Sequence, residues 1–168
     1  MSERSKNYTG EYEWYTPETY LESARNVLGV IDCDPASSFE ANKTVQADSY
    51  YGVDDNGLVH EWNGNVWLNP PYARNLIGKF VSKLISEYES GRTQQAILLT
   101  NSATDTRWYH DAAKASSAMC LTSGRINFVI DGKQMRNTPT GQTFFYFGAN
   151  HELFSYEFHR HGLIVRPC

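Results

Sequence analysis

A chemically unusual tetrapeptide, Asn69-Pro70-Pro71-Tyr72, directly follows the apolar residues 66–68. An exocyclic amine on an aromatic ring, such as N6 of adenine, is a poor nucleophile because its lone pair is delocalised into the ring. The side-chain oxygen of Asn69 and the carbonyl oxygen of Pro70 can accept both hydrogens of such an amine and return electron density to the nitrogen. Prolines suit this arrangement because they offer no N–H that competes for the acceptors. Tyr72 adds an aromatic face on which a base can stack.

The amide of Asn69 takes up no proton at neutral pH, so the segment would activate an amine by hydrogen bonding and not by general-base catalysis. The reaction also needs an electrophile, which a sulfonium methyl donor provides without a metal. The structural alternative is a rigid turn between a strand and a helix, because Asn-Pro and Pro-Pro commonly interrupt both.

The elements around this segment are predicted to alternate between strand and helix. Apolar residues with a 3.6-residue period, together with Pro17, Gly29 and Gly91 as helix boundaries, predict helices over 16–29, 75–91 and 106–116. Predicted strands cover 30–34, 65–69, 95–100, 118–121, 127–130, 143–148 and 156–159. We therefore expect an open α/β sheet with helices on both faces and a β-rich C-terminal part. Polar residues at 32–34, 69–72 and 101–106 follow strands and should meet at one edge.

The composition is that of a folded domain. The chain has 168 residues, of which 40% are hydrophobic and 14% aromatic, and we expect a polar tail over 1–12 and a single domain over 13–168. No apolar run is long enough to cross a membrane, and the N-terminus has no apolar core of a secretion signal. Three cysteines without a CxxC pair favour a reducing, cytoplasmic location. With a net charge of −4, a nucleic-acid partner would require a local basic face.

Several motifs besides NPPY lie between residues 13 and 148. They are YTP (15–17), DCDPA (32–36), DDNGL (54–58), Trp62, TDTRWYH (104–110) and SGRINF (123–128). Together they resemble the phage-type Dam family of S-adenosylmethionine-dependent DNA N6-adenine methyltransferases. The resemblance implies a Rossmann-like methyltransferase sheet, here trimmed, because only 34 residues separate Asp34 from Asn69. The stretch DPASSFEANK also lacks the glycines of an ordinary cofactor-binding turn. We expect no separate target-recognition domain within these residues.

The resemblance further implies a set of residues that hold S-adenosylmethionine: Tyr15, Thr16, Pro17, Asp32, Asp34, Asp54 and Asp55. The first three would lie near the methionine end of the cofactor, where a helix N-terminus favours a carboxylate. The first two aspartates would face its ammonium group or an ordered water, and one of the last two the ribose hydroxyls. These acids have no Glu-x-Lys or histidine partner that would indicate a metal site, so we expect no metal.

The expected partner is double-stranded DNA, from which the enzyme must extrude the target base. Four residues are candidates for contacts with it: Arg74, Arg107, Trp108 and Arg125. For Trp108 the alternative is a half-buried packing role, and for each arginine an ordinary solvated surface position. The expected activity is methyl transfer to adenine N6 of DNA in a bacterial or phage-infected cell. The alternatives are the same chemistry on RNA or on a protein glutamine, or a non-catalytic protein that occludes DNA.

Overall fold

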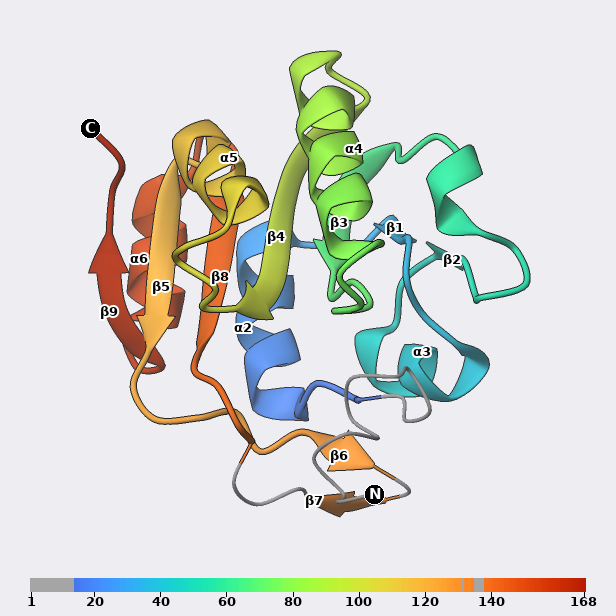
Figure 1. The fold of residues 1–168 in the computed structure, drawn as a ribbon, viewed down its shortest axis with the longest axis horizontal. Helices are drawn as coiled ribbons and strands as arrows, with labels where there is room; N and C mark the ends of the chain where they lie inside the picture. Colours follow the sequence, from blue (N-terminus) through green and yellow to red (C-terminus); the bar gives the residue numbers. More distant parts are fainter. Residues whose placement is uncertain (1–13, 131, 135–137) are drawn as a thin grey trace.

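A computed structural model describes residues 14–130, 132–134 and 138–168 of the chain. Seven strands form one mixed sheet in the order β2-β1-β3-β4-β8-β5-β9 (Figure 1). The strands are β1 (Cys33–Asp34), β2 (Ser49–Tyr50), β3 (Gly64–Leu68), β4 (Thr93–Asn101), β5 (Ala118–Thr122), β8 (Gln142–Phe147) and β9 (Gly162–Val165). A separate hairpin consists of β6 (Val129–Ile130) and β7 (Lys133–Gln134). The helices are α2 (Glu18–Leu28), α3 (Phe39–Val45), α4 (Ile77–Glu89), α5 (Arg107–Ala115) and α6 (His151–Phe158), with a 3₁₀ turn η1 (Gly57–Val59).

The strand directions place most carboxyl ends at the same edge of the sheet. β2, β1, β3 and β4 are parallel neighbours, whereas β8 runs antiparallel between β4 and β5, and β9 is antiparallel to β5. β5 therefore points in the same direction as β4. The β6–β7 hairpin lies beyond this carboxyl edge (Figure 1).

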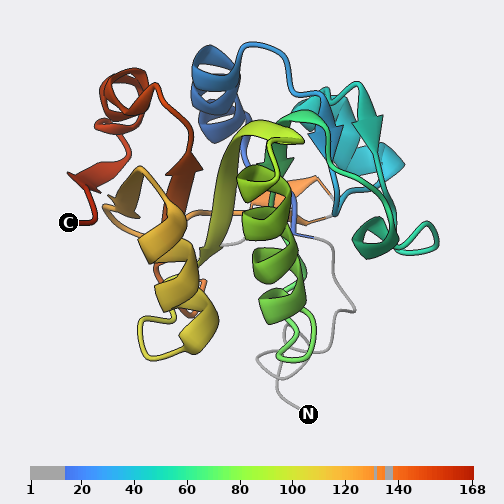
Figure 2. The same cartoon turned by 90° about the horizontal axis from the view of Figure 1, so that it is seen from above.

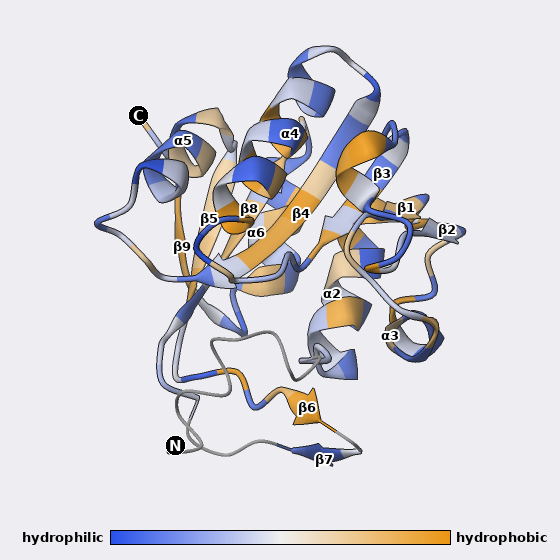
Figure 3. Ribbon diagram, turned by 45° about the vertical axis from the view of Figure 1, so that its right-hand side comes forward, coloured by the Kyte–Doolittle hydropathy of each residue, from blue (hydrophilic) through white to orange (hydrophobic). Residues whose placement is uncertain are grey.

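Helices cover both faces of the sheet, as the sequence predicted. Figure 2 shows α2 and α6 on one side and α4 and α5 on the other. In β4, Ile97 and Leu99 pack toward the first side while Ala96 and Leu98 pack toward the second, and all four are fully buried. This two-sided burial explains why the strand is apolar throughout its middle instead of alternating with polar residues (Figure 3).

The prediction of a β-rich C-terminal part is wrong in one segment. Residues 156–159 were expected to form a strand, but they lie in α6 and at its end. The side chain of Asn150 caps this helix by accepting a hydrogen bond from the Leu153 N–H at 3.4 Å. Phe154 and Phe158, four residues apart, are fully buried against the sheet, so one face of the helix is apolar.

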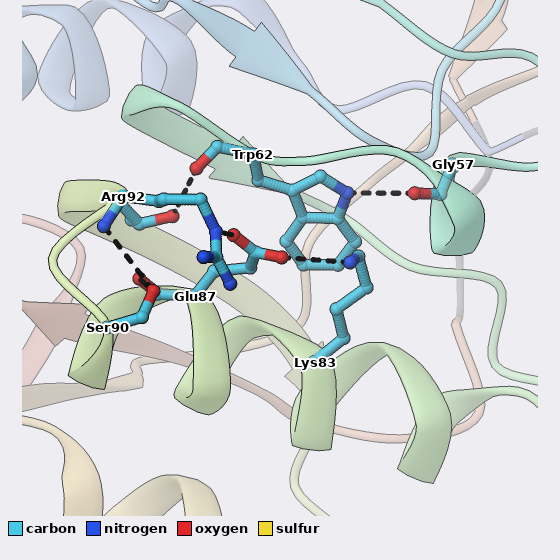
Figure 4. Close-up of polar contacts among 7 residues, drawn as sticks. Gly57, Trp62, Lys83, Glu87, Ser90 and Arg92 are labelled. Atoms are coloured by element: carbon cyan, nitrogen blue, oxygen red, sulfur yellow. Dashed lines mark hydrogen bonds and ion pairs between the residues drawn. The ribbon is translucent and has the colours of Figure 1, made fainter.

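A buried ionic network lies where α4 leads into β4 (Figure 4). The Glu87 side chain is 4% exposed and binds Arg92 Nε at 2.5 Å and Lys83 Nζ at 2.9 Å. The Lys83 ammonium also lies over the Trp62 ring, whose indole N–H donates to the Gly57 carbonyl at 2.8 Å. The network connects α4 to the segments that precede β3 and β4, at the amino ends of these strands.

Candidate active site

The predicted polar segments meet at the carboxyl edge of the sheet. Asp34 ends β1, Asn69 follows β3 and Asn101 ends β4, and these three strands are parallel neighbours. In open α/β sheets this edge is where ligands bind. The arrangement therefore brings an acid and an amide to the same edge of the sheet.

The Asn69 amide has hydrogen-bond partners on both sides. Its Nδ2 group donates to the Trp14 carbonyl at 3.4 Å and to the Thr16 hydroxyl oxygen at 3.3 Å. Its Oδ1 atom accepts from the Tyr72 hydroxyl at 2.7 Å. An amide oxygen has two lone pairs, so Oδ1 can accept one further hydrogen bond from a ligand amine.

The two prolines and the tyrosine of the segment have different environments. Pro70 is buried, Pro71 is exposed, and Tyr72 is half-buried against the apolar cluster beneath α4. The Tyr72 hydroxyl also lies 3.5 Å from the Leu99 carbonyl of β4. Burial raises the pKa of Tyr72 above its ordinary value, so the hydroxyl is a neutral hydrogen-bond donor at physiological pH.

Asp34 is a buried acid at the end of β1, with a residue exposure of 2%. Its Oδ1 atom accepts from the Ala36 N–H at 3.2 Å. Burial raises the pKa of Asp34 to about 7, although the Ser37 hydroxyl and the Ala36 N–H favour the charged form. Ser37 Oγ is itself buried and makes no hydrogen bond of normal geometry within the described chain. A cationic ligand at this position would stabilise the carboxylate.

The other predicted cofactor acids have environments that differ from that of Asp34. The Asp32 carboxylate accepts from the Asn65 N–H at 2.6 Å, at the amino end of β3, and therefore faces away from Asn69. Asp54 and Asp55 are exposed in the turn that follows β2. Asp55 Oδ2 accepts from the Gly52 N–H at 2.9 Å and closes this turn.

Two aromatic residues at this edge were not singled out from the sequence. The rings of Tyr51 and His60 are stacked, with centroids 4.1 Å apart and an interplanar angle of 1°. The Tyr51 N–H donates to the Asp34 carbonyl at 3.0 Å, so the pair lies next to the end of β1. The available signal was an aromatic residue directly after the short strand β2, but that strand itself was not predicted.

The segment that precedes α2 reaches the site, although not through the predicted helix cap. The prediction placed Thr16 as the N-cap, whereas the helix begins at Glu18 with Pro17 in the cap position. Tyr15 pairs with Val129 through two backbone hydrogen bonds of 2.9 Å. The segment is thereby held between α2 and the β6–β7 hairpin, with Thr16 beside Asn69.

The candidate DNA contacts divide into two groups. Arg74, Arg107 and Arg125 follow β3, β4 and β5, respectively, and all three lie at the carboxyl edge. The Arg107 side chain is 94% exposed and 3.8 Å from Asp111, whereas Arg125 donates to the Thr138 carbonyl at 2.7 Å. Trp108 instead lines a groove of about 410 Å³ between α4 and α5 and is half-buried there.

Within residues 14–130, 132–134 and 138–168, no three histidine, cysteine or acidic side chains are grouped so that they could hold a metal ion. No helix of this part of the chain is long and apolar enough to cross a membrane.

The chain is similar in sequence to proteins of one enzyme family. A family model described as DNA N-6-adenine-methyltransferase (Dam) matches residues 5–151. A protein of Escherichia phage T1 named DNA N-6-adenine-methyltransferase is 31% identical over 123 residues, which cover 72% of this chain and 49% of the phage protein. The chain thus spans about half the length of the curated relative that it matches.

Proposed function

Because this chain belongs to the DNA N-6-adenine-methyltransferase (Dam) family, we propose that it transfers a methyl group from S-adenosylmethionine to N6 of adenine in double-stranded DNA. The observation that carries the proposal is the Asn69 amide at the carboxyl end of β3, held on its nitrogen side and followed by two prolines and a tyrosine. The family membership supports methyl transfer as the reaction, and the position of the Asn69 amide supports the carboxyl end of β3 as the place where it occurs.

Asn69 and Pro70 are proposed to bind the adenine amine. Asn69 Oδ1 and the Pro70 carbonyl each accept one N6 hydrogen, which raises the electron density on the nitrogen. Neither group takes up a proton at neutral pH, so the residues orient and polarise the amine while its proton leaves to solvent. Tyr72 stacks on the extruded base, a contact worth about 1–3 kcal/mol by analogy with single-stranded nucleic-acid binding.

The cofactor is proposed to lie along the ends of β1 and β2. S-adenosylmethionine, when bound, supplies an electrophilic methyl group on a positively charged sulfur. Asp34 fits its ammonium group, because it is a buried carboxylate that makes no ion pair with any described basic side chain. The turn with Asp54 and Asp55 follows β2 and fits the ribose hydroxyls.

The other proposed cofactor contacts come from the residues before α2 and from Asp32, which directly precedes β1. Tyr15 and Pro17 lead into α2 and would face the methionine carboxylate near the N-terminus of this helix, whereas the hydroxyl of Thr16 between them already faces the Asn69 amide. Asp32 is already bound to the start of β3, so we propose that it supports the cofactor site through the backbone of β1 and β3.

DNA is proposed to bind across the carboxyl edge. The chain carries a net charge of −4, so phosphate contacts must come from the local arginines 74, 107 and 125. Trp108 would reach DNA only from the groove between α4 and α5, and we propose that it mainly packs these helices together. The reaction would take place in the cytoplasm of a bacterial or phage-infected cell.

A transfer assay with labelled cofactor tests this function. Purified protein is incubated separately with DNA, RNA and protein, and the labelled atom is identified. We expect label at adenine N6 of DNA. Asn69→Ala should lower the rate by roughly 10²–10³-fold, the range seen when one preorganised polar contact is removed from an active site, without changing cofactor affinity.

The matched control is Asn63→Ala, because Asn63 is an exposed asparagine that precedes β3 at its other end. Label only in RNA or only in protein would reassign the substrate. DNA binding without transfer to any acceptor would refute the catalytic role and favour an occluding protein.

A further inference from the structure

The orientation of the Asn69 amide is set by a segment far away in the sequence. Both acceptors of its Nδ2 group, the Trp14 carbonyl and the Thr16 hydroxyl oxygen, come from the residues before α2. A side-chain amide can rotate to exchange its oxygen and nitrogen, and the rotated form would present N–H groups to an amine that itself needs acceptors. The site therefore requires a feature that distinguishes the two orientations.

We propose that Thr16, together with the Trp14 carbonyl, is a positioning element that keeps Asn69 Oδ1 directed toward the substrate amine. This inference rests on the proposed function. A backbone carbonyl can only accept, so Trp14 favours the orientation in which Nδ2 faces it. The Thr16 hydroxyl adds a second acceptor on the same side, 3.3 Å from Nδ2.

The segment is itself held in place, as a positioning element must be. Tyr15 and Val129 exchange two backbone hydrogen bonds of 2.9 Å, and the Trp14 ring lies 5.4 Å from that of Phe128. Thr16 is 6% exposed, so water competes little for its hydroxyl. The acceptors are consequently arranged before any ligand arrives, which lowers the ordering required in the reaction.

The oxygen side of the amide also has a partner. The Tyr72 hydroxyl donates to Oδ1 at 2.7 Å. A hydroxyl can also accept, so the acceptor-only Trp14 carbonyl is the group that distinguishes the two orientations. Asn69 thus has acceptors facing its nitrogen and a donor facing its oxygen. An aspartate at this position would place a carboxylate oxygen against the Trp14 carbonyl, so Asn69→Asp should be a poor substitute despite its similar shape.

The test compares Thr16→Val, which removes the hydroxyl and keeps the shape, with Thr16→Ser, which restores it. Thr19→Val is the matched control, because Thr19 is exposed in the first turn of α2. We expect Thr16→Val to lower kcat about 5- to 10-fold, the equivalent of one lost hydrogen bond, with the cofactor Kd changed by less than about twofold. Thr16→Ser should recover most of the lost rate, and Thr19→Val should match the wild type.

A nuclear magnetic resonance measurement keeps the proposal falsifiable if Thr16→Val folds poorly. The side-chain amide protons of Asn69, assigned by their loss in Asn69→Ala, should exchange with water clearly more slowly in the wild type than those of the exposed Asn63. Equally fast exchange at both residues would refute a fixed orientation.

The kinetic outcomes separate the two proposals. If Thr16→Val weakens cofactor binding and leaves kcat unchanged, Thr16 is a cofactor contact and the positioning role is wrong. An active wild type with an unaltered Thr16→Val rate refutes the positioning role alone. A wild type that methylates no DNA refutes the proposed function and this inference together.

Discussion

Replacing Asp34 with asparagine should stabilise the free protein and weaken cofactor binding. The pKa of Asp34 is raised from 3.8 to about 7, chiefly by burial. An acid whose folded pKa lies above its unfolded value makes the folded state less stable as the pH rises from the unfolded toward the folded pKa. Asparagine keeps an acceptor for the Ala36 N–H but carries no charge, so the variant should escape this loss.

The size of the effect follows from the pKa change. A rise of roughly three units corresponds to at most about 4 kcal/mol above neutral pH, since one unit is worth about 1.4 kcal/mol. Relaxation of the folded state and entry of water reduce such values, so we expect a gain of about 1–2 kcal/mol at about pH 8. At about pH 5 the folded carboxyl is still protonated and the gain should be smaller by about half or more.

Urea unfolding of the wild type and Asp34→Asn at both pH values measures this difference. Asp48→Asn is the control, because Asp48 is an exposed acid near β2. Cofactor affinity, measured by calorimetry, should fall at least about tenfold in Asp34→Asn, because the proposed ionic contact to the cofactor ammonium would be lost. A variant that is no more stable than the wild type at the higher pH would show that the reasoning about Asp34 is wrong.

Two further substitutions test features outside the site. Glu87→Ala should lower the free energy of unfolding by about 1–3 kcal/mol, because it leaves Lys83 and Arg92, both partly in contact with water, without their ion pairs. Cofactor affinity should not change, because these residues lie at the amino ends of β3 and β4, opposite the carboxyl edge. Burial raises the pKa of Glu87, but hydrogen bonds from Arg92 and Lys83 outweigh this effect and leave the pKa below its ordinary value. The stabilisation by Glu87 should therefore be present above about pH 4.5 and decline as the pH falls further. Acid unfolding of the wild type and of Glu87→Ala would detect this decline. Gly64→Ala should lower the melting temperature by several degrees. Gly64 has φ +77°, and a Cβ added there would lie 2.3 Å from Asp32 Oδ2. An unchanged melting temperature would mean that the backbone at Gly64 relaxes freely.

Much of the fold could be predicted because the central elements follow strong local patterns. The predicted helix over 75–91 contains α4, and the predicted strand over 95–100 lies within β4, since both have long, regular apolar repeats. The segment that became α6 was ambiguous. Phe154, Tyr156 and Phe158 alternate as in a strand, yet Phe154 and Phe158 are also one helical turn apart, and packing against the sheet decided between the two.

The place of Asn69 in the fold was predictable, but its contacts were not. Asn69 was expected at a strand end, and the parallel order of β1, β3 and β4 places it at the same edge of the sheet as Asp34. The hydrogen bond from Asn69 to Thr16 could not be foreseen, because it depends on where the residues before α2 cross the sheet edge. The hydrogen bond that Asn69 accepts from Tyr72 was not foreseen either. A threonine before a helix is equally consistent with an N-cap, and only the three-dimensional arrangement shows that its hydroxyl faces the amide.

The position of β8 has a consequence for how the protein is made. In the described sheet β8 is the strand that joins β4 to β5, yet it is formed by residues 142–147, which leave the ribosome after both of its neighbours. A nascent chain that ends before this segment therefore exposes an apolar strand edge at β4, next to the residues proposed to bind the base. Synthesis of residues 142–147 is therefore the step that closes this edge.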